Sequence, residues 1–118
     1  MTTTAPRSPS TSTTDLAAAL RAAVSGEVDS APRRLAEYSS DASNYRVVPQ
    51  VVVFPRDAED VIAAHRVARE TGTSITMRGG GTSVAGNAIG PGIVLDTSRH
   101  MNKIIEIEIG RASCRERV

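Results

Sequence analysis

The chain has 118 residues, enough for one small domain, with no tryptophan, one phenylalanine and two tyrosines. A domain of about this size buries roughly two-thirds of its unfolded surface, so its core must be built from Val, Ile, Leu and Ala, which suits a layered helix-and-sheet fold. No apolar run approaches the roughly 20 residues of a membrane span. The formal net charge of +1 gives no electrostatic sign of a nucleic-acid partner.

The two ends of the chain differ in composition from the middle. Residues 1–14 are rich in Thr, Ser and Pro without an apolar segment, so we expect a disordered leader, not a secretory signal, and a cytoplasmic location. Residues 108–118 are identical to the translation of a widely used sequencing-adapter oligonucleotide, so we expect an artefactual tail and a natural gene that continues. Without the tail's three arginines and two glutamates, the 14 basic and 13 acidic residues become 11 of each. The only cysteine, Cys114, also lies there, so neither disulfides nor thiolate metal sites are expected elsewhere.

After the leader, apolar residues at a spacing of four predict a short amphipathic helix that ends near Gly26. Thr14 or Asp15 can cap its start. Residues 35–46 are polar and predict an irregular or partly helical connection. Residues 15–46 therefore form an N-terminal helical and irregular segment. The apolar positions of the helix are Leu16, Leu20 and Val24.

A β-branched run between two prolines, residues 50–54, predicts a buried strand. A helix from about Ala58 to Thr71 follows it. Asp57 can serve as its N-cap, and Gly72 stands where a left-handed C-cap residue is expected. The expected apolar stripe contains Val61, Ala64 and Ala68, flanked by Ile62 and Val67, while Arg66, Arg69 and Glu70 face water.

Three further strands are expected at residues 74–77, 92–96 and 103–106. The order strand, helix, strand, loop, strand predicts an α+β domain of α/β-like character, with a βαββ unit preceded by a helix. Parallel pairing of the first two strands would make a right-handed crossover.

The most informative segment is the glycine-rich loop from Arg78 to Ala88. Its consecutive glycines, residues 79–81, permit positive φ and let a ligand approach the main chain closely. Successive N–H groups can then converge on an anion, and Arg78 can add a charge-assisted contact. The loop is therefore suited to a diphosphate. Short side-chain donors at the same mouth are Thr82, Ser83 and Asn87.

Two better-known phosphate loops do not fit this segment. Gly81 and Gly86 have the spacing of a P-loop, but Asn87 takes the place of the required lysine. The dinucleotide fingerprint requires a third glycine where Val84 stands, and no helical pattern follows the loop directly. A glycine-rich connection without a ligand and a non-catalytic phosphate- or nucleotide-binding module both stay open as alternatives.

Four motifs stand in order along the chain: Tyr38 to Arg46, Pro55 to Val61, Arg78 to Ala88, and Val94 to Ser98 with Met101-Asn102. Together they resemble successive landmarks of the FAD-linked oxidases that have a vanillyl-alcohol-oxidase or PCMH-type FAD-binding domain. The resemblance covers about residues 38–106 and is strongest to D-lactate dehydrogenase-like proteins and to the flavin-binding D component of glycolate oxidase. One motif alone is only moderately specific, but four in order are a strong signal.

The resemblance implies that residues 47–107 are the first half of a PCMH-type FAD-binding domain, whose glycine loop wraps the FAD pyrophosphate. Some relatives attach FAD covalently through a histidine at the position of Thr82, so non-covalent binding is implied at this loop. The implied cofactor-binding residues are Arg78, Gly79, Gly80, Gly81, Thr82, Ser83, Gly86 and Asn87.

By the same resemblance, the complete enzyme oxidises a D-2-hydroxy acid of the lactate or glycolate type. The α-hydrogen passes to flavin N5 while a base takes the hydroxyl proton. In the family, the base and the substrate carboxylate are handled mainly by a later domain, so no catalytic residue is assigned here and the chain alone should lack turnover. An iron–sulfur cluster, as in the long bacterial forms, would also lie outside this chain, and the full-length protein could be peripheral to the inner membrane.

Other polar residues are assigned structural roles. His65 in a helix and His100 in a turn have no partners at metal-ligand spacing, so no metal site is predicted. Arg46 is predicted to form a structural ion pair, with a contact to the cofactor or substrate as the alternative. Asp96 is predicted to cap a turn at the end of a strand.

Overall fold

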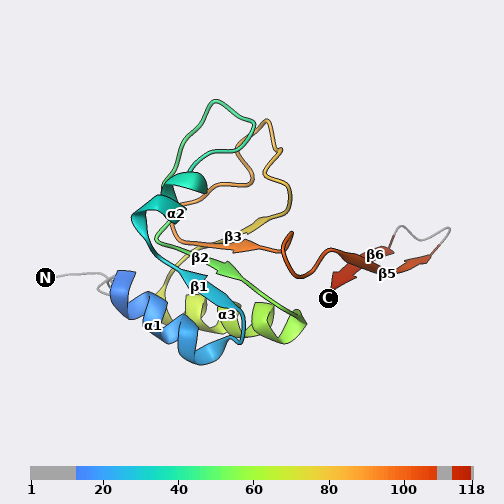
Figure 1. The fold of residues 1–118 in the computed structure, drawn as a ribbon, viewed down its shortest axis with the longest axis horizontal. Helices are drawn as coiled ribbons and strands as arrows, with labels where there is room; N and C mark the ends of the chain where they lie inside the picture. The colour runs from blue at the N-terminus through green and yellow to red at the C-terminus, as the bar shows by residue number, and fades with distance from the viewer. Residues whose placement is uncertain (1–12, 109–112, 118) are drawn as a thin grey trace, which may run out of the picture.

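The computed structural model describes residues 13–108 and 113–117 of the chain. The strands and helices expected from the sequence are all present at close to their expected positions, and β1, α2 and β6 are additional. In chain order (Figure 1), the elements are α1 (Thr13–Ala23), β1 (Glu27–Asp29), α2 (Pro32–Glu37), β2 (Val51–Phe54), α3 (Ala58–Thr71), β3 (Ile75–Arg78), β4 (Ile93–Asp96), β5 (Lys103–Glu108) and β6 (Ser113–Arg117).

Four of the strands form one mixed sheet in the order β1-β2-β4-β3. β1 is antiparallel to β2, whereas β2 and β3 are each parallel to β4, which lies between them. β2 and β3 are thus parallel to each other, as a crossover requires, but β4 lies between them and they do not pair directly. The physical reason lies in burial: all residues of β4 are buried, as a central strand requires, whereas Met77 of β3 is 46% exposed, as suits an edge.

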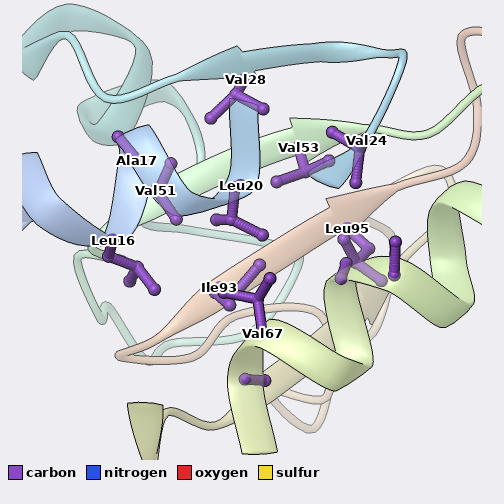
Figure 2. Close-up of a cluster of buried hydrophobic side chains, with 13 residues drawn as sticks. Leu16, Ala17, Leu20, Val24, Val28, Val51, Val53, Val67, Ile93 and Leu95 are labelled. Atoms are coloured by element: carbon purple, nitrogen blue, oxygen red, sulfur yellow. The ribbon is translucent and has the colours of Figure 1, made fainter. Parts of the chain in front are cut away.

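The main core lies between the sheet and the two helices α1 and α3, which cover the same face (Figures 1 and 2). Alternate residues of β2 and β4 point into it because successive strand side chains face opposite sides. Each fully buried Val, Leu or Ile side chain contributes about 1.5–3 kcal/mol. The cluster consists of Leu16, Ala17, Leu20, Val24, Val28, Val51, Val53, Ala63, Ala64, Val67, Ala68, Ile93 and Leu95.

A smaller apolar cluster lies on the opposite face of the sheet, on the side of α2 (Figure 1). Val52, Phe54 and Val94 form it, with Leu35 and Tyr38 packed against them. The Tyr38 and Phe54 rings meet edge to face, with centroids 5.9 Å apart. The sheet is thus covered on both sides, by α1 and α3 on one face and by α2 and its neighbouring loops on the other.

Both ends of α3 are formed as the sequence predicts. The Asp57 carboxylate accepts a hydrogen bond from the Asp60 N–H at 3.0 Å, and Gly72 takes the left-handed conformation at φ 67°. The apolar stripe differs in one detail: Ile62 is 58% exposed, whereas Ala63 is buried. The buried stripe is rotated toward Asp60, which is itself buried at the start of the helix.

Asp60 joins the start of α3 to the turn between α1 and β1. Its carboxylate accepts hydrogen bonds from the N–H groups of Ser25 at 2.9 Å, Gly26 at 3.1 Å and Arg56 at 3.0 Å. Burial raises the pKa of Asp60, but the hydrogen bonds from Ser25, Arg56 and Gly26 outweigh it and hold the pKa below 3.8. Gly26 must be glycine because a Cβ would lie 2.1 Å from the Phe54 carbonyl oxygen.

Beyond the sheet, β5 and β6 pair antiparallel as a hairpin that extends away from the rest of the domain (Figure 1). β6 lies within residues 108–118, where the sequence predicts an artefactual tail and therefore no strand. The artefactual origin of that tail stays a prediction. In the part of the chain that the structure describes, no helix has the length and apolar character needed to cross a membrane.

Candidate nucleotide-binding site

The glycine loop lies on the α2 side of the sheet, next to the segment that joins α2 to β2. Both loops rise from the sheet on this side (Figure 1), where residues 79–92 lead from the end of β3 back to the start of β4. The loop crosses β3 closely at Gly90, where a Cβ would lie 2.1 Å from the Thr76 hydroxyl oxygen. Ala88, Ile89 and Gly90 are buried, so this return half of the loop is fixed to the sheet.

The first half of the loop presents its backbone to solvent. Gly79 and Gly80 are exposed, and a Cβ at Gly79 would meet no atom within 4 Å. Gly81 and Gly86 have φ of 70° and 81°, conformations that other residues adopt at a cost. A ligand can therefore reach the main chain over the first two glycines, while the other two shape the loop.

The backbone N–H groups of residues 79–84 have no hydrogen-bond partner among the residues that the structure describes. The N–H groups further along are used: those of Ala85 and Asn87 donate to the Ser83 hydroxyl oxygen at 3.2 and 3.1 Å. An exposed row of free amides next to glycines is the arrangement with which proteins bind phosphate through the main chain. The first half of the loop therefore offers main-chain donors to an anionic ligand.

A second segment, for which the sequence predicts only an irregular connection, supports the loop. The Asp41 carboxylate accepts a hydrogen bond from the Ala88 N–H at 3.2 Å and further ones from Ser43. The Ser43 hydroxyl, with the backbone bonds and the nearby Arg78 charge, lowers the pKa of Asp41. The Tyr45 ring lies over Gly86, where a Cβ would come within 2.9 Å of it. The spacing of Asp41 and Ser43 is typical of an Asx-type turn, and it could have predicted an ordered turn in this segment.

Below the loop, Tyr38 and Asp96 join α2 to the end of β4. The Tyr38 hydroxyl donates to the Asp96 carboxylate, which also accepts from the Ser98 N–H at 2.8 Å. Burial of the Tyr38 hydroxyl and its bond to this negative charge raise its pKa to about 12. The expected turn-capping role of Asp96 is confirmed, and its bond to Tyr38 is an addition.

Arg78, for which the sequence predicts a charge-assisted contact with the diphosphate, makes its hydrogen bonds with protein groups. Its guanidinium Nη1 donates to the carbonyl oxygens of Ser40 at 3.0 Å and Ala88 at 3.2 Å. The guanidinium carbon lies 4.8 Å from the centroid of the Tyr38 ring. In this structure the side chain therefore contacts the neighbouring segment and the end of its own loop.

Arg46 and His65, the other polar residues considered from the sequence, contact protein groups in the structure. Arg46 donates to the Ser39 hydroxyl at 3.0 Å, and within the described residues its expected ion pair is not formed. His65 is exposed on α3 with Nδ1 2.8 Å from the Val61 carbonyl oxygen. Across residues 13–108 and 113–117, no group of three His, Cys, Asp or Glu side chains is placed to hold a metal ion.

The mixed sheet covered on both faces, together with the glycine loop and its free amides, defines an α+β domain suited to binding a diphosphate. Its family is known from comparison with other proteins. The chain belongs to the FAD binding domain family, whose model matches residues 49–115.

Individual relatives agree with this family. Over 72 residues the chain is 49% identical to D-2-hydroxyglutarate dehydrogenase of Escherichia coli, which covers 58% of this chain and 7% of that protein. It is 33% identical over 63 residues to the mitochondrial D-lactate dehydrogenase [cytochrome] of Kluyveromyces lactis, covering 50% of this chain and 11% of that protein. The chain thus spans only a small part of the curated relatives that it matches.

The fold is shared with solved structures as well. The chain resembles the wild-type BBE-like 1 protein of Physcomitrella patens with a TM-score of 0.66 and 21% sequence identity. That match covers 76% of this chain and 20% of the other protein. At this identity the likeness concerns the fold alone, and it confirms the expected fold class.

Proposed function

We propose that this chain binds FAD non-covalently through its glycine loop and belongs to an oxidoreductase that acts on a D-2-hydroxy acid. The observation that carries the proposal is the run of free N–H groups at residues 79–84, beside the open faces of Gly79 and Gly80. Amide donors that need no rearrangement to meet two phosphates are pre-organised for binding, which lowers its cost. FAD, when bound, would accept the electrons released as the hydroxy acid becomes a keto acid.

The residues of the loop support non-covalent attachment at this point. Thr82 stands at the position where some members of the family that the sequence resembles carry a linking histidine, and it lacks the imidazole nitrogen that such a link requires. The cofactor-binding set we propose has two parts. Gly79, Gly80 and Thr82 are exposed and supply main-chain donors, and the loop shape depends on Gly81, Ser83, Gly86 and Asn87.

The choice of substrate class rests on the named relatives. The E. coli relative is named for D-2-hydroxyglutarate, a D-2-hydroxy acid with a second carboxylate, and the K. lactis relative is named for D-lactate. Both names share the D-2-hydroxy acid group, so this class is the proposal and the dicarboxylate is its first candidate. A cytoplasmic location is part of the same proposal.

Two proteins test the proposal: the chain itself and a longer version in which residue 107 continues into the sequence that follows in the source gene. Both are purified and incubated with FAD, and bound flavin is measured by absorbance after dialysis and again after denaturation. We expect flavin that is released by denaturation, as non-covalent binding requires. The longer protein is then assayed with D-2-hydroxyglutarate, D-lactate and glycolate and a dye as electron acceptor.

Each outcome of these measurements has a separate meaning. Flavin retained through denaturation contradicts non-covalent binding. If neither protein binds FAD but both bind ADP or inorganic pyrophosphate, the domain is a non-catalytic phosphate- or nucleotide-binding module. A longer protein that binds FAD but oxidises none of the three acids contradicts the proposed substrate class alone.

A further inference from the structure

Arg78 contacts the glycine loop at three separate points. As the last residue of β3 it begins the loop, and its Nη1 donates to the Ala88 carbonyl oxygen at the other end at 3.2 Å. The same guanidinium lies against Gly81 in the middle, where a Cβ would come within 2.4 Å of Nη2. One side chain therefore fixes the start, middle and end of the loop relative to one another.

The guanidinium also joins the loop to the neighbouring segment. Nη1 donates to the Ser40 carbonyl oxygen at 3.0 Å, and the guanidinium carbon lies 4.8 Å from the centroid of the Tyr38 ring. Asp41 completes the connection, because its carboxylate accepts from the Ala88 N–H at 3.2 Å. Both Nη1 hydrogens are thus used by carbonyl groups, and a carboxylate partly compensates the charge.

These contacts differ from those of a phosphate-binding arginine. Such a residue presents its donors as a planar fork to the anion, usually in pairs. Here both hydrogen bonds of Arg78 run from Nη1 to protein carbonyls, and the rest of the guanidinium lies behind Gly81 and against the Tyr38 ring.

We propose that Arg78 is a positioning residue, which holds the glycine loop in its binding shape from behind while backbone amides alone contact the diphosphate. This inference rests on the proposed function. Gly81 is part of the same device, because any larger residue there would displace the guanidinium as well as adopt an unfavourable φ. Asp41 acts on the loop in the same way through Ala88.

The two possible roles of Arg78 predict opposite effects of lysine. Lysine is an effective point-charge partner for phosphate, but a single ammonium cannot bond two carbonyls while lying on the Tyr38 ring. If Arg78 positions the loop, Arg78→Lys and Arg78→Ala should each lower FAD affinity by about tenfold, the equivalent of 1.4 kcal/mol. The dependence of affinity on salt should then match that of the wild type, because no positive charge in contact with the anion has been removed.

The experiment compares the wild-type chain with both Arg78 variants, using flavin fluorescence at two salt concentrations. Arg66→Lys and Arg66→Ala are matched controls, because Arg66 is exposed on α3, which covers the opposite face of the sheet from the loop. Amide hydrogen exchange at Ala88 is measured in parallel without FAD. We expect exchange about tenfold faster in both Arg78 variants, since opening of the loop becomes easier, and no change in the controls.

Three results would overturn the proposal. One is wild-type affinity in Arg78→Lys together with a weaker salt dependence in Arg78→Ala, which indicates direct contact with phosphate. Another is unchanged exchange at Ala88 in the variants. If Arg78→Lys and Arg78→Ala do not fold, the milder Arg78→Gln replaces them, and unchanged exchange at Ala88 in that variant overturns the proposal equally. Failure of the wild type to bind FAD contradicts the proposed function, whereas the exchange measurement still decides the role of Arg78.

Discussion

Gly79 and Gly72 both have room for a larger side chain, but only Gly72 has a backbone conformation that disfavours one. Gly79 has no positive φ and a Cβ there would meet no atom within 4 Å, so Gly79→Ala should leave the free energy of unfolding unchanged. FAD affinity should nevertheless fall about tenfold or more, because the methyl group would stand where the ligand approaches the main chain. Urea unfolding and flavin fluorescence measure the two effects.

Gly72→Ala is the matched control for that variant. Its φ of 67° makes alanine unfavourable by about 1 kcal/mol, but the residue ends α3 and does not belong to the loop. We expect a loss of stability without a loss of affinity for the folded protein. Equal FAD affinity of Gly79→Ala and the wild type would show that ligands do not approach over this glycine.

The Tyr38 hydroxyl offers a test of the contact below the loop. The chain has only two tyrosines, so in a Tyr45→Phe variant the absorbance of tyrosinate reports Tyr38 alone. Its midpoint should lie near pH 12, because burial and Asp96 both favour the neutral phenol. A midpoint near the ordinary value of 10 would show that the bond to Asp96 is not maintained in solution.

This shift has a consequence for stability at high pH. A group whose folded pKa is raised contributes stability that is complete below its unfolded pKa and is lost as the pH rises through the folded value. The contribution of Tyr38 should therefore be complete below pH 10 and disappear toward pH 12. In a Tyr38→Phe variant, the free energy of unfolding should depend less on pH in this range.

At the scale of elements, the contact between α3 and the α1–β1 turn depends on Asp60. Asp60→Asn replaces one acceptor oxygen by an N–H₂ group facing the N–H groups of Ser25, Gly26 and Arg56. Because some of these partly buried donors lose their acceptor, we expect a loss of about 1–3 kcal/mol in urea unfolding. Glu59→Gln, an exposed change in the same helical turn, should cost only a few tenths of a kcal/mol.

The pH dependence of this contact follows from the lowered pKa of Asp60. A carboxyl group with a depressed folded pKa contributes stability above its unfolded pKa and loses it as the pH falls through the folded value. The wild type should therefore lose this stability below about pH 4, and the difference from Asp60→Asn should shrink there. A difference that stays constant down to pH 2 would contradict the charged role of Asp60.

Local signals were enough to place most elements but not to order the strands. Asp57 and Gly72 fix the ends of α3, and the β-branched runs locate β2 and β4. The insertion of β4 between β2 and β3 depends on long-range burial, which no local spacing encodes. β1 is only three residues long, so its sequence carries too little periodicity to predict a strand. The turn before it is held by Asp60, which lies 35 residues later in the chain than Ser25.

At the scale of the whole molecule, the candidate site combines a predictable part with a part that only the fold assembles. The consecutive glycines identify the loop because their backbone freedom is a property of the residues themselves. The support from Asp41, Tyr45 and Tyr38 comes from a segment about 40 residues earlier, brought next to the loop by packing on one face of the sheet. The sequence predicts a phosphate contact for Arg78, whereas in the structure its bonds join that segment, at Ser40, to the end of the loop, at Ala88.

The most direct test of main-chain diphosphate binding is an NMR titration of the isotope-labelled chain with FAD, followed by ADP and riboflavin. FAD and ADP should shift the amide proton resonances of residues 79–84 downfield, as new hydrogen bonds to phosphate oxygens form. The Gly26 and Gly72 amides, which are already bonded within the protein, should stay in place, and riboflavin, which has no phosphate, should leave the loop unchanged. Saturation with FAD that moves resonances elsewhere but leaves residues 79–84 unshifted would contradict the central claim.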